Sequence, residues 1–164
     1  MKIVIISGYF NPIHVGHINY IKSTSALGNK LITIINNDIQ AKKRCVQNNM
    51  KEQDRMKVVS ALKHIDDVIL SIDTDESVTE TLKKVVKKYS FCDRNRFIFA
   101  NGGDMPYGAP EEEYCKNHYL IDTAYNVGDC KNAATDEFAS FKQRMNLGWD
   151  IPSFPGAEIF ESDT

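Results

Sequence analysis

The sequence predicts a single α/β domain built on a parallel sheet. Five short apolar runs, rich in β-branched residues, alternate with segments whose apolar residues recur at helical spacing. Parallel strands need a crossover connection between them, and helices supply it, so this alternation favours helices on both faces of the sheet. The chain of 164 residues is long enough for one domain with a sizeable core.

The first half of the chain is expected to supply three of the strands. Residues 2–6 and 30–35 are continuous apolar runs, and the helix between them is expected to end at Gly28, a residue type that often follows a helix. A helix is expected over residues 51–65, and the third strand over residues 67–72. The apolar face of that helix consists of Val58, Val59, Leu62 and Ile65.

The second half of the chain continues the alternation. Acidic residues at 73–76 are expected to cap a helix with a continuous apolar stripe. The residues of that stripe are Val78, Leu82, Val85, Val86 and Tyr89. Residues 96–100 form the fourth strand, residues 111–117 a short helix and residues 119–126 the last strand. A final helix is expected over residues 136–145.

Composition narrows the possible function classes. Hydrophobic residues make up 42% of the chain and the formal net charge is −2, so no basic field attracts nucleic acid. No apolar run approaches the roughly 20 residues that span a bilayer. The four cysteines are scattered without a Cys-x-x-Cys pair, as in a reducing compartment. We expect a cytoplasmic protein with neither nucleic-acid nor membrane partners, with a domain over residues 1–146 and a tail over residues 147–164.

The turn over residues 7–17 combines several residue types that suit a phosphate site. It contains two glycines, Gly8 and Gly16, which allow close approach to the backbone, and it leads into a helix N-terminus, which favours an anion. His14 and His17 are three residues apart and can therefore face one phosphate oxygen together. The pair could also supply two zinc ligands, although the turn has no Cys, Asp or Glu to complete the set.

Polar residues also follow the second and fourth strands. Lys42, Lys43 and Arg44 come shortly after the second, and residues 101–104, Asn-Gly-Gly-Asp, come directly after the fourth. Ligands of α/β sheets bind at the carboxyl ends of the strands, so we expect both segments to share a crevice with the turn at 7–17. The cations would contact phosphate there, the alternative being an ordinary solvated surface.

Residues 8–17 also carry a resemblance to a known superfamily. They read Gly-Tyr-Phe-Asn-Pro-Ile-His-Val-Gly-His, similar to the signature Gly-x-Phe-(Asp/Asn)-x-x-His-x-Gly-His of the cytidylyltransferase-like nucleotidyltransferases. That superfamily includes glycerol-3-phosphate cytidylyltransferase and the heptose-1-phosphate adenylyltransferases. The resemblance spans residues 1–146 and implies a Rossmann-like, five-stranded parallel sheet of order 3-2-1-4-5, in a homodimer.

The resemblance implies a reaction as well. CMP or AMP would pass from CTP or ATP to a small phosphorylated acceptor such as glycerol 3-phosphate or a sugar phosphate, with release of pyrophosphate. His14 and His17 would bind the α- and β-phosphate oxygens in the transition state. Lys42, with Arg44, would neutralise the pyrophosphate. Mg²⁺ would arrive with the triphosphate, since phosphates and waters are its usual ligands and no protein ligand for a metal is apparent in the sequence.

The other implied positions include two open questions. Asn11 stands where many family members have Asp, and it can hydrogen-bond but brings no charge. Arg55 either reaches a phosphate or pairs with Glu52. The residues expected to shape the loop are Gly8, Tyr9, Phe10 and Gly16, and those expected to hold the base and ribose are Gly102, Gly103 and Asp104.

The sequence departs from the family pattern in two places. Thr135 remains in the family's Ser/Thr-rich turn, but Ala133 and Ala134 replace the expected hydroxyls, and Met105 replaces an expected Arg or Tyr. These departures keep a second hypothesis open, a nucleotide-binding module without transferase activity. A third hypothesis is a zinc-dependent hydrolase that uses the histidine pair.

Overall fold

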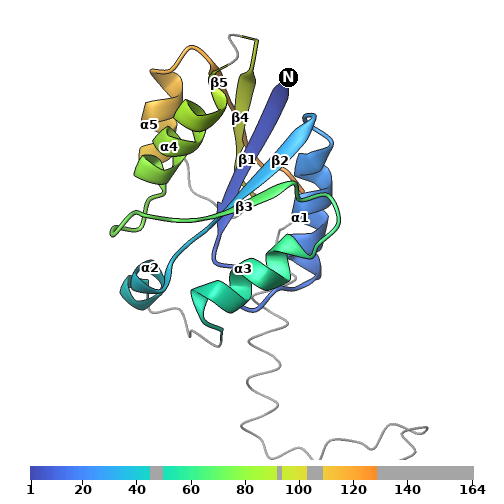
Figure 1. Cartoon of the computed structure of the whole chain (residues 1–164), viewed down its shortest axis with the longest axis vertical. Helices are drawn as coiled ribbons and strands as arrows, with labels where there is room; N and C mark the ends of the chain where they lie inside the picture. The colour runs from blue at the N-terminus through green and yellow to red at the C-terminus, as the bar shows by residue number, and fades with distance from the viewer. Residues whose placement is uncertain (45–49, 92–93, 103–108, 129–164) are drawn as a thin grey trace, which may run out of the picture.

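Five parallel strands form the centre of the structure (Figure 1). The strands are β1 (Lys2–Gly8), β2 (Lys30–Ile35), β3 (Asp67–Leu70), β4 (Arg96–Ala100) and β5 (Ile121–Ala124). Their order is β3-β2-β1-β4-β5 and every neighbouring pair is parallel, which confirms the predicted fold class and strand order. The structure is a computed structural model that describes residues 1–44, 50–91, 94–102 and 109–128.

Helices cover both faces of this sheet, as predicted. They are α1 (Val15–Ser25), α2 (Asp38–Lys43), α3 (Glu52–Ser60), α4 (Thr79–Tyr89) and α5 (Pro110–Lys116). Helices α1 and α3 lie against one face and α4 and α5 against the other, while α2 lies beyond the carboxyl end of β2 (Figure 1). No helix in the four described stretches is long and apolar enough to cross a bilayer.

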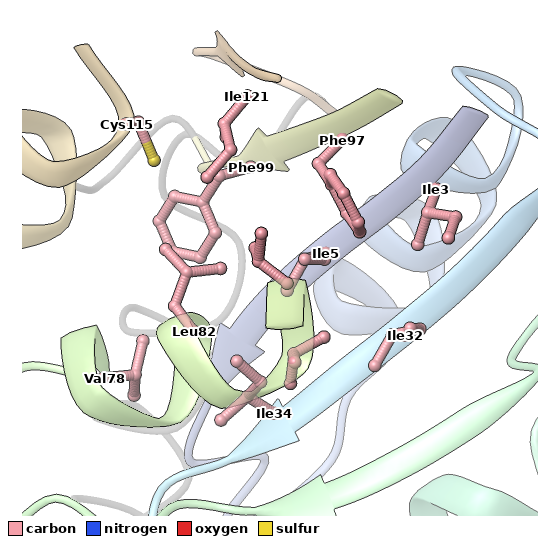
Figure 2. Packing of buried hydrophobic residues seen from close by; sticks show 12 residues of the cluster. Ile3, Ile5, Ile32, Ile34, Val78, Leu82, Phe97, Phe99, Cys115 and Ile121 are labelled. Carbon is pink, nitrogen blue, oxygen red and sulfur yellow. The ribbon is translucent and has the colours of Figure 1, made fainter. Parts of the chain in front are cut away.

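The two faces of the sheet have separate cores, because side chains alternate along each strand. On β1, Ile3 and Ile5 pack toward α4 and α5, whereas Val4 and Ile6 pack toward α1 and α3, and all four are fully buried. Figure 2 shows the first of these cores, where Leu82 of α4 meets isoleucines and phenylalanines of the sheet. Burial on both faces explains why the central strands read as continuous apolar runs.

Helix α3 is shorter than the sequence predicts. It ends at Ser60 rather than at residue 65, and His64 adopts a left-handed conformation with φ 79°. Leu62 and Ile65 still pack against the core, but from the turn that leads into β3. The apolar spacing therefore predicted contact with the core correctly for Val59, Leu62 and Ile65, but it was wrong for Val58, which is exposed, and for the length of the helix.

Gly28 does not terminate α1 in the predicted way. The helix ends at Ser25, with Ala26 as its C-cap, and Gly28 lies two residues further along. A Cβ on Gly28 would lie 2.8 Å from the carbonyl oxygen of Lys2 and 2.7 Å from Cγ2 of Val4. The glycine is required here because the chain passes directly over β1.

Helix α4 is capped by an acidic residue that lies several positions before it. The helix begins at Thr79, and the carboxylate of Asp73 accepts hydrogen bonds from the backbone N–H groups of Glu80 (2.8 Å) and Thr81 (3.0 Å). The Thr81 hydroxyl also donates to this carboxylate. The predicted acidic cap is thus confirmed for Asp73, which reaches the helix across a loop.

Candidate active site

The turn between β1 and α1 brings its two histidines into contact. The ring centroids of His14 and His17 are 3.8 Å apart, and the ring of Phe10 lies 4.9 Å from that of His17. Phe10 is buried in the core beneath the turn and has φ 50°, so its backbone bends sharply while its ring anchors the loop. His14 is the N-cap residue of α1, which places both imidazoles at the helix N-terminus.

Both glycines of the turn have a packing reason. A Cβ on Gly8 would lie 3.0 Å from the Phe10 ring, and one on Gly16 would lie 3.0 Å from Cε1 and Nδ1 of His14. The absence of side chains lets the aromatic rings lie close against the backbone. The geometry thus gives Gly8, Phe10 and Gly16 a part in shaping the loop.

His17 is held as a neutral imidazole. Its burial, followed by the nearby charge of His14, lowers the pKa of His17 from 6.5 to about 4. A neutral imidazole has one N–H donor and one acceptor nitrogen. The Nδ1 atom of His17 is buried, and no described residue forms a hydrogen bond with it. At neutral pH, His17 can therefore stabilise an oxyanion as an uncharged hydrogen-bond donor.

The carboxyl ends of the strands place further segments at the same edge. The backbone N–H of Asn36, just after β2, donates to the carbonyl of Gly8 at 3.0 Å. The hydroxyl of Tyr20 on α1 donates to the carbonyl of Ala100 at the end of β4, at 2.6 Å. Gly102 follows two residues later and is half-buried. The end of β2 is thus hydrogen-bonded to Gly8 at the start of the histidine turn, and the end of β4 to α1, the helix that follows the turn.

Helix α2 carries the predicted cations. Lys42, Lys43 and Arg44 are all exposed at its carboxyl end. The guanidinium of Arg44 lies 5.9 Å from the centroid of the Tyr9 ring, a distance that suits a cation–π contact. Burial raises the pKa of Tyr9, so its phenol stays protonated at neutral pH. The structure therefore brings Arg44 beside the turn that contains the histidines.

Arg55 forms an ion pair that differs from the predicted one. Its guanidinium pairs with Asp38 at 2.7 Å, and Glu52 instead accepts a hydrogen bond from the backbone N–H of Asp38 at 2.8 Å. Arg55 is fully buried, and its guanidinium donates hydrogen bonds to three backbone carbonyls and to the Asp38 carboxylate. Of the two alternatives that the sequence left open for Arg55, the pairing with Glu52 is wrong, because the guanidinium pairs instead with the carboxylate of Asp38, the first residue of α2.

An amide network beneath α2 includes Asn37 and Gln40, two residues that were not predicted to have a role. The side chain of Asn37 caps α2 and donates to the carbonyls of Ser71 (3.0 Å) and Asp73 (2.8 Å). Gln40 completes a capping box with Asn37 and donates to two further carbonyls of the loop before α4. The Asn-x-x-Gln spacing is the signal that could have predicted this cap.

Several predicted site residues lie outside the described stretches. These are Gly103, Asp104, Met105, Ala133, Ala134, Thr135, the helix at 136–145 and the tail at 147–164. Among the residues that the structure describes, no group of three or more His, Cys, Asp or Glu side chains could hold a metal ion.

The sequence model of the family described as "Cytidylyltransferase-like" matches residues 5–143. The chain belongs to this family. The match includes the histidine turn, the cations of α2 and the described strands from Ile5 onward.

Curated relatives from several organisms match part of the chain. The FAD synthase of Pyrococcus abyssi is 35% identical over 83 residues, which cover 50% of this chain and 55% of that protein. The FAD synthase of Thermoplasma acidophilum is 33% identical over 85 residues, covering 51% of this chain and 60% of that protein. The bifunctional protein HldE of Coxiella burnetii is 36% identical over 93 residues, covering 52% of this chain and 19% of that protein. The chain thus spans little more than half the length of these FAD synthases.

A solved structure shares the fold. The lipopolysaccharide core biosynthesis protein of Thermoplasma volcanium superposes with a TM-score of 0.60 at 24% identity, covering 78% of this chain and 98% of that one. At this identity the likeness concerns the fold alone.

Proposed function

We propose that this protein is a nucleotidyltransferase that moves AMP from ATP to a small phosphorylated acceptor and releases pyrophosphate. The close pair of His14 and His17 at the N-terminus of α1, with ring centroids 3.8 Å apart, is the observation that carries the proposal. FAD contains an adenylyl group joined through a pyrophosphate bond to a flavin phosphate. Relatives named FAD synthase therefore favour ATP over CTP and a phosphate-bearing acceptor. We further infer a cytoplasmic homodimer whose only ligands are small molecules.

The reaction needs no protein nucleophile. A phosphate oxygen of the acceptor attacks the α-phosphorus of ATP, the bond from that phosphorus to the bridging oxygen breaks, and pyrophosphate leaves with the bonding electrons. Catalysis then consists of positioning the reactants and stabilising charge on the phosphoryl oxygens. His14 and His17 would donate hydrogen bonds to these oxygens, while Lys42 and Arg44 would neutralise the departing pyrophosphate.

Other residues would hold the nucleotide in place. Gly8, Tyr9, Phe10, Asn11 and Gly16 would form the wall of the phosphate site, and backbone N–H groups at the start of α1 face the same space. The residues assigned to the base, ribose and remaining phosphate contacts are Gly102, Gly103, Asp104 and Thr135. Arg55 would support the nucleotide site from beneath it, since its guanidinium is fully buried among protein acceptors.

A magnesium ion fits this site only as part of the substrate. The turn offers imidazoles and an amide, and no described cluster supplies three metal-binding side chains. Mg²⁺ prefers oxygen ligands and retains several waters. We therefore infer that Mg²⁺ is held by the triphosphate oxygens, where it would offset their negative charge.

Pyrophosphate release tests the proposal directly. The protein is incubated with Mg²⁺ and each of ATP, CTP, GTP and UTP, in the presence of FMN, glycerol 3-phosphate or sugar phosphates. We expect release that requires ATP together with one acceptor, and a His17→Ala variant with kcat lowered by roughly 10²–10³, the scale for losing one preorganised transition-state donor. His118→Ala, a variant of a histidine that stacks on Tyr119 near β5, is the matched control and should retain wild-type activity.

Three outcomes would change the assignment. A fall of less than threefold in His17→Ala would remove His17 from the mechanism. Tight ATP binding without pyrophosphate release across the acceptor panel would identify a nucleotide-binding module. Stoichiometric bound zinc with hydrolysis that a chelator abolishes would identify a hydrolase.

A further inference from the structure

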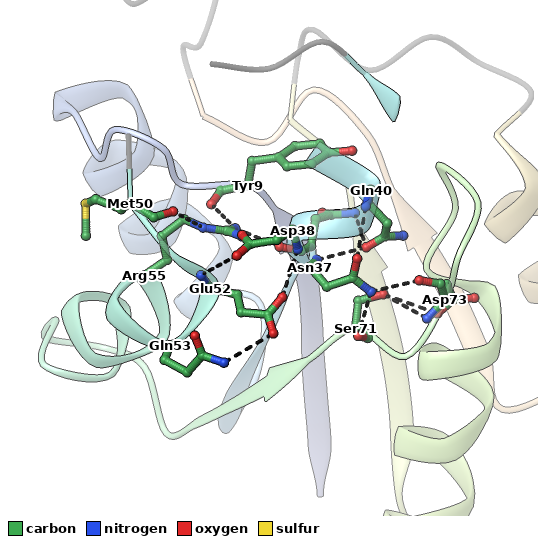
Figure 3. Close-up of polar contacts among 11 residues, drawn as sticks. Tyr9, Asn37, Asp38, Gln40, Met50, Glu52, Gln53, Arg55, Ser71 and Asp73 are labelled. Carbon is green, nitrogen blue, oxygen red and sulfur yellow. Dashed lines mark hydrogen bonds and ion pairs between the residues drawn. The ribbon is translucent and has the colours of Figure 1, made fainter. Parts of the chain in front are cut away.

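Arg55 is a fully buried charge at the centre of the sheet's carboxyl edge. From α3, its Nη1 donates to the carbonyls of Tyr9 (2.9 Å) and Asn36 (2.6 Å), and its Nη2 donates to Oδ1 of Asp38 (2.7 Å). Its Nε donates to the carbonyl of Met50 at 3.2 Å. Figure 3 shows Arg55 with Tyr9, Asp38 and Met50, which come from three separate segments of the chain.

Two of those segments carry the groups that the proposed function needs. Tyr9 belongs to the turn that leads to His14 and His17. Asn36 and Asp38 flank the N-cap residue of α2, the helix that ends with the exposed cations. One guanidinium therefore bridges the turn assigned to the α-phosphate and the helix assigned to pyrophosphate. The carbonyl of Tyr9 lies 46 positions from Arg55 in the sequence, and this long-range bridge adds a side-chain link to the backbone hydrogen bond from Asn36 to Gly8 at 3.0 Å.

We propose that Arg55 is a positioning residue that fixes the histidine turn relative to α2, so that both act on one triphosphate. This inference rests on the proposed function. Arginine suits the role because its planar fork holds several donors in fixed directions, whereas lysine concentrates them on one mobile ammonium. Burial of a charge is costly unless it is paired and hydrogen-bonded, and four protein acceptors meet that condition here.

The bridge also affects how His17 is enclosed. The turn shields the imidazole from water, and this burial is the main cause of its lowered pKa of about 4. If the turn loses its tie to α2, water reaches the imidazole more easily and the pKa should rise toward 6.5. The pKa of His17 thus reports the position of the turn in a way that does not depend on catalysis.

The test compares Arg55→Lys with Arg96→Lys. Arg96 is a matched control because its guanidinium also donates to a carbonyl, that of Tyr119 at 2.9 Å, but at the opposite end of the sheet. For Arg55→Lys we expect kcat with ATP and acceptor to fall by about 10- to 100-fold, since a displacement of about 1 Å can cost 10²-fold. We also expect an NMR titration to show the His17 pKa raised toward 6.5. Arg96→Lys should change neither quantity.

A second variant keeps the test decisive if Arg55→Lys does not fold. Asp38→Asn removes the charge partner but retains an oxygen that can accept from Arg55, so we expect the same two changes at smaller size. Folded variants with kcat within twofold of wild type, or with an unchanged His17 pKa, would overturn the positioning role. If the wild-type protein shows no transferase activity, a raised His17 pKa in Arg55→Lys would still support the bridge, while the proposed function itself would fail.

Discussion

At the scale of single residues, His17 shows how the turn changes the chemistry of an ordinary side chain. An exposed imidazole would be partly protonated just below neutral pH, whereas His17 remains neutral down to about pH 4 because it is buried and lies beside His14. A neutral imidazole can donate a hydrogen bond to an anionic substrate, while its positive charge is not required for that contact. The same burial links protein stability to pH.

The stability of the protein should fall as pH decreases from about 6.5 toward 4. Because the folded-state pKa of His17 is lowered, the unfolded chain binds the proton more tightly in this range, so the stabilisation present above pH 6.5 is lost on acidification. The difference between 6.5 and about 4 corresponds to roughly 3 kcal/mol. Urea unfolding at pH 7.5 and 4.5 should show a smaller loss for His17→Gln than for wild type, and equal losses would contradict the pKa assignment.

At the scale of elements, the loop between β3 and α4 is organised by side chains that replace missing backbone bonds. Asp73 supplies acceptors to the first turn of α4, which otherwise has unpaired N–H groups. Asn37 and Gln40 of α2 donate to carbonyls of the same loop. This loop thus joins α2, which lies beyond the carboxyl end of β2, to α4, which lies against one face of the sheet.

Asp73→Ala should reduce the free energy of unfolding by about 1–2 kcal/mol, the scale for losing a helix cap. The cost arises because Asp73 is buried and the N–H groups of Glu80 and Thr81 would lose their acceptor. Asp54→Ala is the control, since Asp54 is exposed and its ion pair with Lys57, at 3.7 Å, lies on the surface. Denaturant unfolding of both variants measures the difference, and equal values would show that Asp73 does not cap α4.

At the scale of the whole molecule, two cores share one sheet. The alternating side chains of each strand tie α4 and α5 to one face and α1 and α3 to the other. The histidine turn is therefore supported by the core beneath α1, and the loop before α4 by the opposite core. Damage to the core beneath α4 and α5 should therefore lower global stability without altering the chemistry of the turn directly.

Leu82→Ala should destabilise the protein by about 2–5 kcal/mol, because it opens a cavity between α4 and the sheet at a fully buried position. Lys84→Ala, on the exposed side of the same helix, should change the free energy of unfolding by less than about 0.5 kcal/mol. Thermal or urea unfolding checks both values. A loss below about 1 kcal/mol for Leu82→Ala would indicate that α4 is packed more loosely than the structure shows.

The sequence by itself determined the class and order of the elements. Apolar runs such as residues 2–6 and 30–35 encode buried strands, and the helical segments between them require parallel pairing. The histidine pair could also be predicted from the sequence, since both histidines and the two neighbouring glycines lie within one short turn. These features depend on local pattern, which a single sequence displays directly.

Only the tertiary structure decided which distant groups meet. The sequence offered Glu52 as the neighbour of Arg55 on the helix, yet the guanidinium pairs with Asp38 and reaches the carbonyl of Tyr9. Likewise Gly28 was legible as a glycine after a helix, but its close passage over Lys2 depends on how the turn crosses β1. The physical reason is that the spacing of apolar residues indicates which side chains share a buried face of a helix or strand. The hydrogen-bond partners of a residue depend instead on which distant segments meet at the edge of the sheet.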